Sequence, residues 1–227
     1  MRIALLFLAF CGAAALAQPR ILSSPADDVA FRDEAAVQYR KILASVSAKG
    51  KLDDDPVLLA RVRRITAGLA IAASQVRAET SSWSWEVHVT SDPSKGAFCM
   101  AGGKLLIGRA LVQGLDLTDG ELAMLLGHEI AHAVADHRRE VSRTTMDTDP
   151  AAEIREAAIA VGQEDEADRI GMDLAHRAGW PAASLVGFFD KLAAHESPGT
   201  FNSSHASAAS RAVAARAMAR TLGTAPQ

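Results

Sequence analysis

Hydrophobic residues recur every three or four positions in two segments early in the chain, at about residues 33–47 and 56–77. This spacing is typical of amphipathic helices that bury one face. Asp55 and Pro56 stand where the second segment starts, and a capping side chain followed by a first-turn proline favours a helix that begins there. We therefore predict two helices in this part of the chain.

The period changes to strict alternation at residues 83–90, where apolar and polar side chains take turns. Alternation is typical of a half-buried β-strand. An Asp-Pro pair at 92–93 predicts a turn. Residues 96–107 contain a Gly-Gly pair before an apolar run, which predicts a hairpin that returns to a second strand. The chain is thus expected to contain a small sheet.

Helical spacing returns in the second half of the chain. Thr118 and Glu121 have the spacing of a capping box, which predicts a helix that starts there and continues past residue 126. Further helices are predicted at about 152–178 and 182–194, and a short Ala/Arg-rich helix after a loop at 197–204. The pattern as a whole predicts a mainly helical α+β protein.

The first 17 residues have the pattern of a secretory signal peptide. Arg2 precedes an uncharged apolar run that ends in small residues at the positions a signal peptidase recognises, so we expect cleavage after Ala17. A membrane anchor is the alternative, but the run is shorter than the roughly 20 apolar residues of a bilayer span. No later stretch is as long and apolar as a span, so no stable membrane span is expected after signal removal.

Only two cysteines are present, Cys11 and Cys99. Cys11 would leave with the signal peptide, so the mature protein would hold a single thiol, which we expect to be buried and inert. An exported protein with one unpaired thiol points to the bacterial periplasm.

Composition narrows the class of protein further. The 227 residues are 49% hydrophobic and 22% charged, which fits one globular domain over residues 18–227. The formal net charge is -3 and no basic cluster is present, so a nucleic-acid partner is not expected. Two cysteines cannot build a four-thiolate zinc site. Any bound metal must be held by histidine and carboxylate.

The motif HExxH, well inside the helix that begins near Thr118, carries the clearest chemistry. His128 and His132 lie one helical turn apart on the same face, where two imidazoles can bind one zinc ion. Glu129 is rotated by one residue, so it can reach a water on the metal without binding the metal itself. This pattern predicts a zinc site with Glu129 as the general base.

A catalytic zinc site usually has three protein ligands and one open position, so a third donor is needed. The stretch 163–168 of the predicted helix at 152–178 holds four carboxylates, among which Glu164 and Asp168 share one face. That face can supply a zinc ligand and an acceptor for the second ring nitrogen of a histidine, a role that suits Asp168.

The remaining histidines have no such pattern. We expect His137, five positions after His132, to be a structural contact rather than a ligand. His88, His176 and His195 are expected to be surface or packing residues.

Four parts of the sequence together resemble the zinc metalloendopeptidase family of HtpX, the CAAX prenyl endopeptidases and the periplasmic BepA-like proteases, family forty-eight of the metallopeptidases. The resemblance runs from about Trp85 to Arg211 and rests on GAFCMAGGKLLIG, LTDGELAMLLGHEIAHAVADH, EDEADRIGMDLAHRAGWP and the spacing of His205 and Arg211. The chain departs from the usual family pattern at Gly96, Ala101 and Ala206, whereas the metal and base positions match.

The resemblance implies a gluzincin-type domain with a small antiparallel or mixed sheet beside the HExxH helix. It implies one zinc ion per chain, held by His128, His132 and Glu164, with Asp168 supporting a ligand. His205 would be a loop histidine able to cap the metal in a resting state. Arg211 would lie near the cleft and could stabilise the oxyanion that forms during attack. The alternative is that His205 is a polar loop residue and Arg211 a solvated helix charge.

The function expected from these features is that of an exported zinc metalloendopeptidase. By the resemblance, its substrates would be misfolded or misassembled cell-envelope proteins, bound as extended chains that add to a strand edge near residues 97–105. An envelope-protein partner that activates the enzyme is one alternative. A periplasmic holdase or assembly factor with bound zinc and little turnover is another, although the presence of Glu129 argues against it.

Overall fold

The computed structural model describes residues 25–139, 152–195 and 208–224. In chain order the elements are α1 (Pro25–Ser47), α2 (Pro56–Val76), the 3-10 helix η1 (Ala78–Ser82), β1 (Glu86–Thr90), β2 (Ala97–Met100), β3 (Lys104–Gly108), α3 (Arg109–Gly114), α4 (Asp119–Val134), α6 (Ala152–Arg177), α7 (Ala182–His195) and α8 (Ala208–Thr224). The prediction of a mainly helical α+β protein is confirmed.

The sheet has three strands in the order β1-β3-β2. β1 runs parallel to β3, and β2 runs antiparallel to β3, so the sheet is mixed. β3 lies in the centre, and its side chains alternate between the two faces. Leu105 and Ile107 join the main core, whereas Leu106 joins a smaller cluster with residues of α1.

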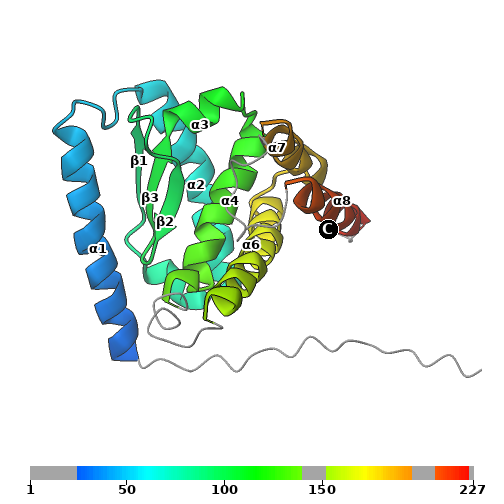
Figure 1. Ribbon diagram of the computed structural model, residues 1–227, viewed down its shortest axis with the longest axis horizontal. Helices are drawn as coiled ribbons and strands as arrows, with labels where there is room; N and C mark the ends of the chain where they lie inside the picture. Colours follow the sequence, from blue (N-terminus) through cyan, green and yellow to red (C-terminus); the bar gives the residue numbers. More distant parts are fainter. Residues whose placement is uncertain (1–24, 140–151, 196–207, 225–227) are drawn as a thin grey trace, which may run out of the picture.

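Helices cover both faces of the sheet. α1 packs on one face and α2 and α4 on the other (Figure 1). Tyr39 of α1 is fully buried, and its hydroxyl donates a hydrogen bond to the carbonyl oxygen of Leu105. The side of the sheet that carries α2 and α4 is the side that positions the functional residues.

Two helix starts follow from their capping residues. Asp55 accepts a hydrogen bond from the backbone N–H of Leu58 at 2.9 Å, with Pro56 in the first turn of α2. Thr118 and Glu121 form the predicted capping box at the start of α4. Lys191 of α7 also donates to the Glu121 carboxylate at 2.7 Å, which fixes this end of α4 against α7.

α4 runs through the middle of the molecule with α6 beside it (Figure 1). The two helices cross at Gly127 and Gly171. A Cβ on Gly127 would lie 2.6 Å from the carbonyl oxygen of Gly171, and a Cβ on Gly171 would lie 2.6 Å from the backbone nitrogen of His128. Glycine at both positions allows the backbones to approach this closely, next to the first residue of the HExxH motif.

Some elements differ from the sequence prediction. α1 begins at Pro25 rather than near residue 33, and the short helices η1 and α3 were not expected. The predicted signal peptide at 1–17 and the loop at 197–204 lie outside the described residues. Cys99 is buried and free, as predicted.

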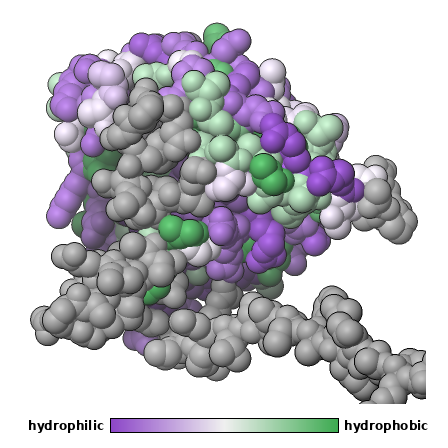
Figure 2. All heavy atoms as spheres, turned by 45° about the vertical axis from the view of Figure 1, so that its right-hand side comes forward, coloured by the Kyte–Doolittle hydropathy of each residue, from purple (hydrophilic) through white to green (hydrophobic). Residues whose placement is uncertain are grey.

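The surface of the described residues is mixed in character. The exposed large apolar side chains are spread over α1, α2 and α8, with Val57, Ile71 and Val213 the most exposed. Hydrophilic and hydrophobic residues intermingle on the face shown in Figure 2. Among the described helices, none combines the length and the hydropathy of a membrane span.

Candidate metal centre

α4 brings the two histidines of the HExxH motif together. Their Nε2 atoms are 3.1 Å apart, and their ring planes are nearly perpendicular, at 82°. His128 is 6% exposed, so this end of the site is shielded from bulk water.

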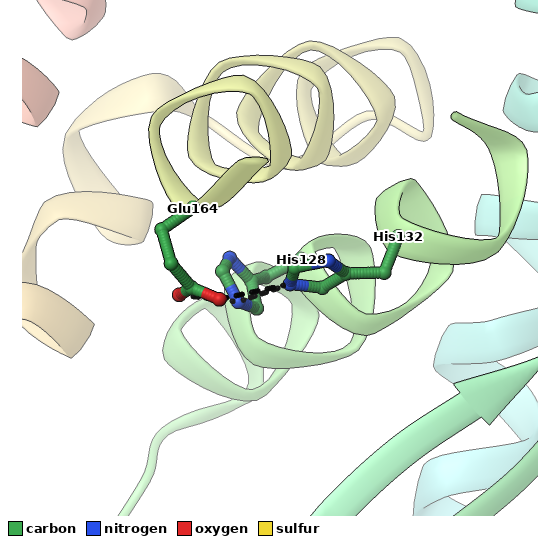
Figure 3. A group of neighbouring side chains, drawn as sticks. All are labelled: His128, His132 and Glu164. Carbon is green, nitrogen blue, oxygen red and sulfur yellow. Dashed lines mark hydrogen bonds and ion pairs between the residues drawn. The ribbon is translucent and has the colours of Figure 1, made fainter. Parts of the chain in front are cut away.

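Glu164 reaches the same point from α6. One of its carboxylate oxygens lies 3.4 Å from Nε2 of His128, and the other lies 3.4 Å from Nε2 of His132. Figure 3 shows the three side chains pointing toward one another from the two helices. Their ligand atoms all lie within 4.8 Å of one another, which makes them a candidate metal site.

The donor set fits a catalytic zinc ion. Two imidazole nitrogens and one carboxylate oxygen are common ligands of such sites, which keep a further position open. Burial raises the pKa of Glu164, but its hydrogen bonds with His128 and His132 outweigh burial and hold the pKa well below its usual range. A carboxylate that stays ionised opposite two imidazoles is what a divalent cation requires.

Asp168 and Arg211 support His128. The Nδ1–H of His128 donates to an Asp168 oxygen at 2.9 Å. Arg211 of α8 binds both oxygens of Asp168, through Nε and Nη2, each at 2.7 Å. Burial lowers the pKa of His128, but the hydrogen bonds with Asp168 and Glu164 dominate and raise it to about 9 in the metal-free protein.

Arg211 lies at the site, but its guanidinium is directed at carboxylates. It is buried, and its Nη1 atom lies 3.4 Å from Glu164 in addition to the two bonds with Asp168. These contacts favour a role in holding Asp168 in place over the oxyanion role expected from the sequence.

The other carboxylates of the acidic stretch point elsewhere. Asp165 is exposed, and Glu166 lies 3.3 Å from Nε2 of His137. The structure thus brings Glu164 and Asp168 to the histidines, as the shared helix face predicted. His205 lies outside the described residues, so its predicted resting-state role stays a prediction.

Glu129 lies on α4 next to these groups and is partly buried. Burial raises the pKa of Glu129 to about 7, while the neighbouring charge of His128 lowers it. A carboxylate with a pKa near neutrality is well matched to general-base catalysis. β2 packs against α4, the helix that carries this base. Burial and the charge of Glu129 raise the pKa of the Cys99 thiol.

Sequence reasoning missed two contacts around the site. Nδ1 of His137 lies 2.8 Å from Nδ1 of His132. His137 lies three residues beyond the end of α4, after Asp136 with its positive φ, so the helical period could not place it beside His132. Arg77, far away in sequence, donates to the carbonyl oxygen of Val134 at 2.7 Å and so holds the end of α4. No local signal marks that contact.

His88 also differs from expectation in one respect. It is partly buried, as a packing residue would be, but its Nδ1 lies 2.6 Å from Asp53 and its Nε2 lies 3.2 Å from Glu86. The contact with Asp53 ties β1 to the connection after α1, whereas Glu86 is on β1 itself; both partners are remote from the metal centre in sequence.

Comparisons with known proteins agree on one class. The model of the family described as Peptidase family M48 matches residues 57–161. The Mitochondrial metalloendopeptidase OMA1 of Arabidopsis thaliana is 42% identical over 57 residues, which are 25% of this chain and 12% of that protein. The protein of the same name from Schizosaccharomyces pombe is 42% identical over 60 residues, 26% of this chain and 18% of that protein. Metalloendopeptidase OMA1 of Bos taurus is 39% identical over 61 residues, 26% of this chain and 11% of that protein.

These matches are local. The chain aligns with less than a fifth of the length of each of these relatives. The family match covers the HExxH helix and ends before Glu164. The third ligand position therefore rests on the geometry of α6.

Proposed function

We propose that the protein is a zinc-dependent metalloendopeptidase of peptidase family M48, the family whose model matches residues 57–161. The single observation that carries the proposal is the convergence of His128, His132 and Glu164 beside Glu129. The names of the OMA1 relatives, all metalloendopeptidases, support the same activity.

In this proposal His128, His132 and Glu164 hold one zinc ion per chain. When bound, zinc supplies Lewis acidity, which polarises a peptide carbonyl and makes a nearby water more acidic. Asp168 orients His128 through its Nδ1–H, and Arg211 holds Asp168 in turn.

Glu129 moves the proton. Its carboxylate accepts a proton from the attacking water and then donates it to the nitrogen of the leaving amine. Binding alone does not need such a group. The presence of Glu129 with a pKa of about 7 therefore favours hydrolysis over a holdase with little turnover.

We place the substrate along β2. The segment expected to bind substrate, residues 97–105, contains β2 and the start of β3. β3 is the central strand of the described sheet, so only β2 has an edge with which an extended chain can pair. An extended chain that pairs with an edge strand is recognised mainly through its backbone, which gives broad sequence specificity. Recognition through the backbone supports unfolded protein as the substrate class. Within that class, we propose misfolded cell-envelope proteins as the substrates.

Export to the periplasm remains a prediction that rests on the pattern of residues 1–17. Fractionation of cells, combined with N-terminal sequencing of the mature protein, tests it. A mature chain that keeps Met1 would contradict cleavage after Ala17.

The deciding experiment for activity compares wild type with Glu129→Gln on casein and on an unfolded outer-membrane protein. We expect Glu129→Gln to keep its fold and its zinc and to lose at least about a hundredfold in rate, the lower end of the range for loss of a general base. Rates near those of wild type would overturn the peptidase mechanism. No cleavage by zinc-loaded wild type would favour the holdase.

Metal analysis tests the ligand set separately. We expect about one zinc per chain in wild type and weak binding in Glu164→Ala. Asp165→Ala is the matched control, because it removes an exposed carboxylate of the same helix that does not face the histidines. If Glu166→Ala lost tight zinc while Glu164→Ala kept it, the choice of ligand would be wrong.

A further inference from the structure

His137 occupies a defined place beside the metal centre. It is 3% exposed and follows the end of α4, with its ring centroid 4.9 Å from that of His132. Its Nδ1 atom lies 2.8 Å from Nδ1 of His132, and its Nε2 atom lies 3.3 Å from an oxygen of Glu166. Gln163 of α6 also donates to its carbonyl oxygen at 3.3 Å.

The direction of these hydrogen bonds follows from the geometry of His132. Its Nε2 faces His128 and Glu164, so Nε2 is the nitrogen that would bind zinc. A neutral imidazole that binds metal through Nε2 carries its hydrogen on Nδ1. The Nδ1–H of His132 must then donate to the atom 2.8 Å away, which is Nδ1 of His137.

The same reasoning fixes His137. Because its Nδ1 accepts, its own hydrogen is on Nε2, where the Glu166 carboxylate is the acceptor. One assignment of hydrogens thus satisfies the contacts from the metal site to Glu166. The reverse assignment would place a hydrogen on the nitrogen of His132 that faces the other two ligands.

We propose that His137 is a positioning residue for the zinc ligand His132. It accepts the Nδ1–H of His132, and its bond with Glu166 keeps it in the form that can accept. The inference rests on the proposed zinc function and deepens it. It assigns His132 a neutral acceptor, whereas His128 has an ionised one, Asp168, held by Arg211.

Both histidines of α4 are then tied to α6 by an acceptor on the side away from the metal. Asp168 belongs to α6 itself, and His137 reaches α6 through Glu166 and Gln163. Hydrogen bonds of this kind fix the ring orientation and tautomer of metal-binding histidines. The third ligand, Glu164, is on α6. The hydrogen bonds between α4 and α6 therefore fix the positions of the three metal donors relative to one another.

Zinc affinity, measured by competition with a fluorescent chelator, tests the proposal without any peptidase assay. His137→Phe keeps the ring volume but removes the acceptor, and we expect zinc to bind about 10–100-fold more weakly. His137→Asn places an amide oxygen near the position of Nδ1, so we expect its affinity within about threefold of wild type. Val134→Ala, at the same end of α4, controls for loss of stability and should leave zinc affinity unchanged.

The pattern across the variants decides the outcome. Unchanged zinc affinity in His137→Phe would overturn the proposal. Equal losses in folded His137→Phe and His137→Asn would also overturn it, because the amide acceptor would then have no effect.

A second measurement needs no variant and covers the case in which His137→Phe does not fold. Nitrogen-15 NMR of zinc-loaded wild type reports the tautomer of each histidine. We expect the hydrogen of His132 on Nδ1 and that of His137 on Nε2. A hydrogen on Nδ1 of His137 would overturn the proposal and would leave the peptidase assignment untouched, whereas zinc-loaded protein that cleaves nothing would overturn the peptidase assignment alone.

Discussion

At the scale of single residues, burial and neighbouring charge act in opposite directions on the groups of the metal centre. For Glu129 burial dominates and the pKa rises, whereas for Glu164 and Asp168 the hydrogen bonds to cations and imidazoles dominate and each pKa falls. Carboxylates on adjacent helices thereby acquire different roles. One can take up a proton near neutral pH, and the other two stay ionised as acceptors.

The raised pKa of Glu129 predicts the pH dependence of cleavage. The base form is needed, and it is lost as pH falls through the pKa, which is about 7 in the metal-free protein. A nearby divalent cation lowers this pKa, so we expect kcat/KM for a peptide substrate to fall at or below pH 7, about tenfold per pH unit once well below the pKa. Rates that rise as pH falls from 7 to 5 would contradict this role.

The ion pair between Arg211 and Asp168 is expected to contribute to the stability of the fold. Arg211→Ala leaves Asp168 in a mostly buried position without its strongest partner, and loss of one member of a buried ion pair typically costs about 3–5 kcal/mol. We expect a decrease of that size in the free energy of unfolding, measured with urea.

Arg216→Ala is the matched control, on the same helix. Arg216 pairs with Asp190, and both side chains are about half exposed, so we expect a change of no more than about 1 kcal/mol. Equal losses for the two variants would show that Arg211 acts only as a helix residue.

At the scale of helices and strands, the sequence predicted best where the signal is local. The starts of α2 and α4 follow from the capping residues directly before them, Asp55 and Thr118. The alternation at residues 83–90 predicted β1. The parallel pairing of β1 with β3 was not predicted, because it depends on contacts between segments distant in sequence. The short helix α3 carries no side-chain cap that would mark its start.

The residues of the site also divide into those with a local sequence signal and those without one. His128 and His132 could be paired from their spacing, and Glu164 with Asp168 from their shared face. The partner of Asp168 could not be found this way, because Arg211 comes from a third helix 43 residues further along the chain. The hydrogen bond from Arg77 to the end of α4 likewise spans 57 residues.

The crossing of α4 and α6 predicts that Gly127→Ala damages metal binding. The added Cβ would lie 2.6 Å from a backbone oxygen of α6, so the helices must separate by a few tenths of an ångström or more. His128 follows directly, and Glu164 is on the opposite helix, so the ligands move apart. We expect weaker zinc binding, measured by chelator competition, and a lower melting temperature.

Gly162→Ala is the control for this prediction. Gly162 is also on α6, but a Cβ there has nothing within 4 Å. Alanine in an exposed helix interior is more stable than glycine by about 0.5–1 kcal/mol, so the melting temperature should stay the same or rise. Wild-type zinc affinity in Gly127→Ala would show that the close crossing does not set the ligand geometry.

At the scale of the whole molecule, the metal centre joins elements from separate parts of the chain. α4 supplies two donors and the base, α6 supplies the third donor and Asp168, and α8 supplies Arg211. Arg77, directly after α2, holds the end of α4 by a hydrogen bond, and β2 of the sheet packs against α4. A metal bound at this point would therefore stabilise the described fold as a whole, since it adds a bridge between α4 and α6 to their packing and to the hydrogen bond of His128 with Asp168.

Metal removal should accordingly lower stability, and the loss should depend on pH. Without metal, the pKa of His128 is raised from 6.5 to about 9, so its hydrogen bonds to Asp168 and Glu164 contribute stability fully below pH 6.5 and lose it as pH rises to 9. Zinc needs the unprotonated ring and must displace that proton at low pH. The stabilisation by zinc should therefore grow from pH 6 to pH 9.

Thermal unfolding with and without EDTA at pH 6, 7.5 and 9 measures this difference. Where free zinc exceeds its dissociation constant about a thousandfold, binding adds about 4 kcal/mol, or about 8–16 °C in a protein of this size. His128→Gln should remove both the effect of EDTA and the pH dependence due to this group, whereas His195→Gln, at an exposed position, should change neither. An EDTA effect of equal size at pH 6 and pH 9 would contradict competition between zinc and the proton at His128.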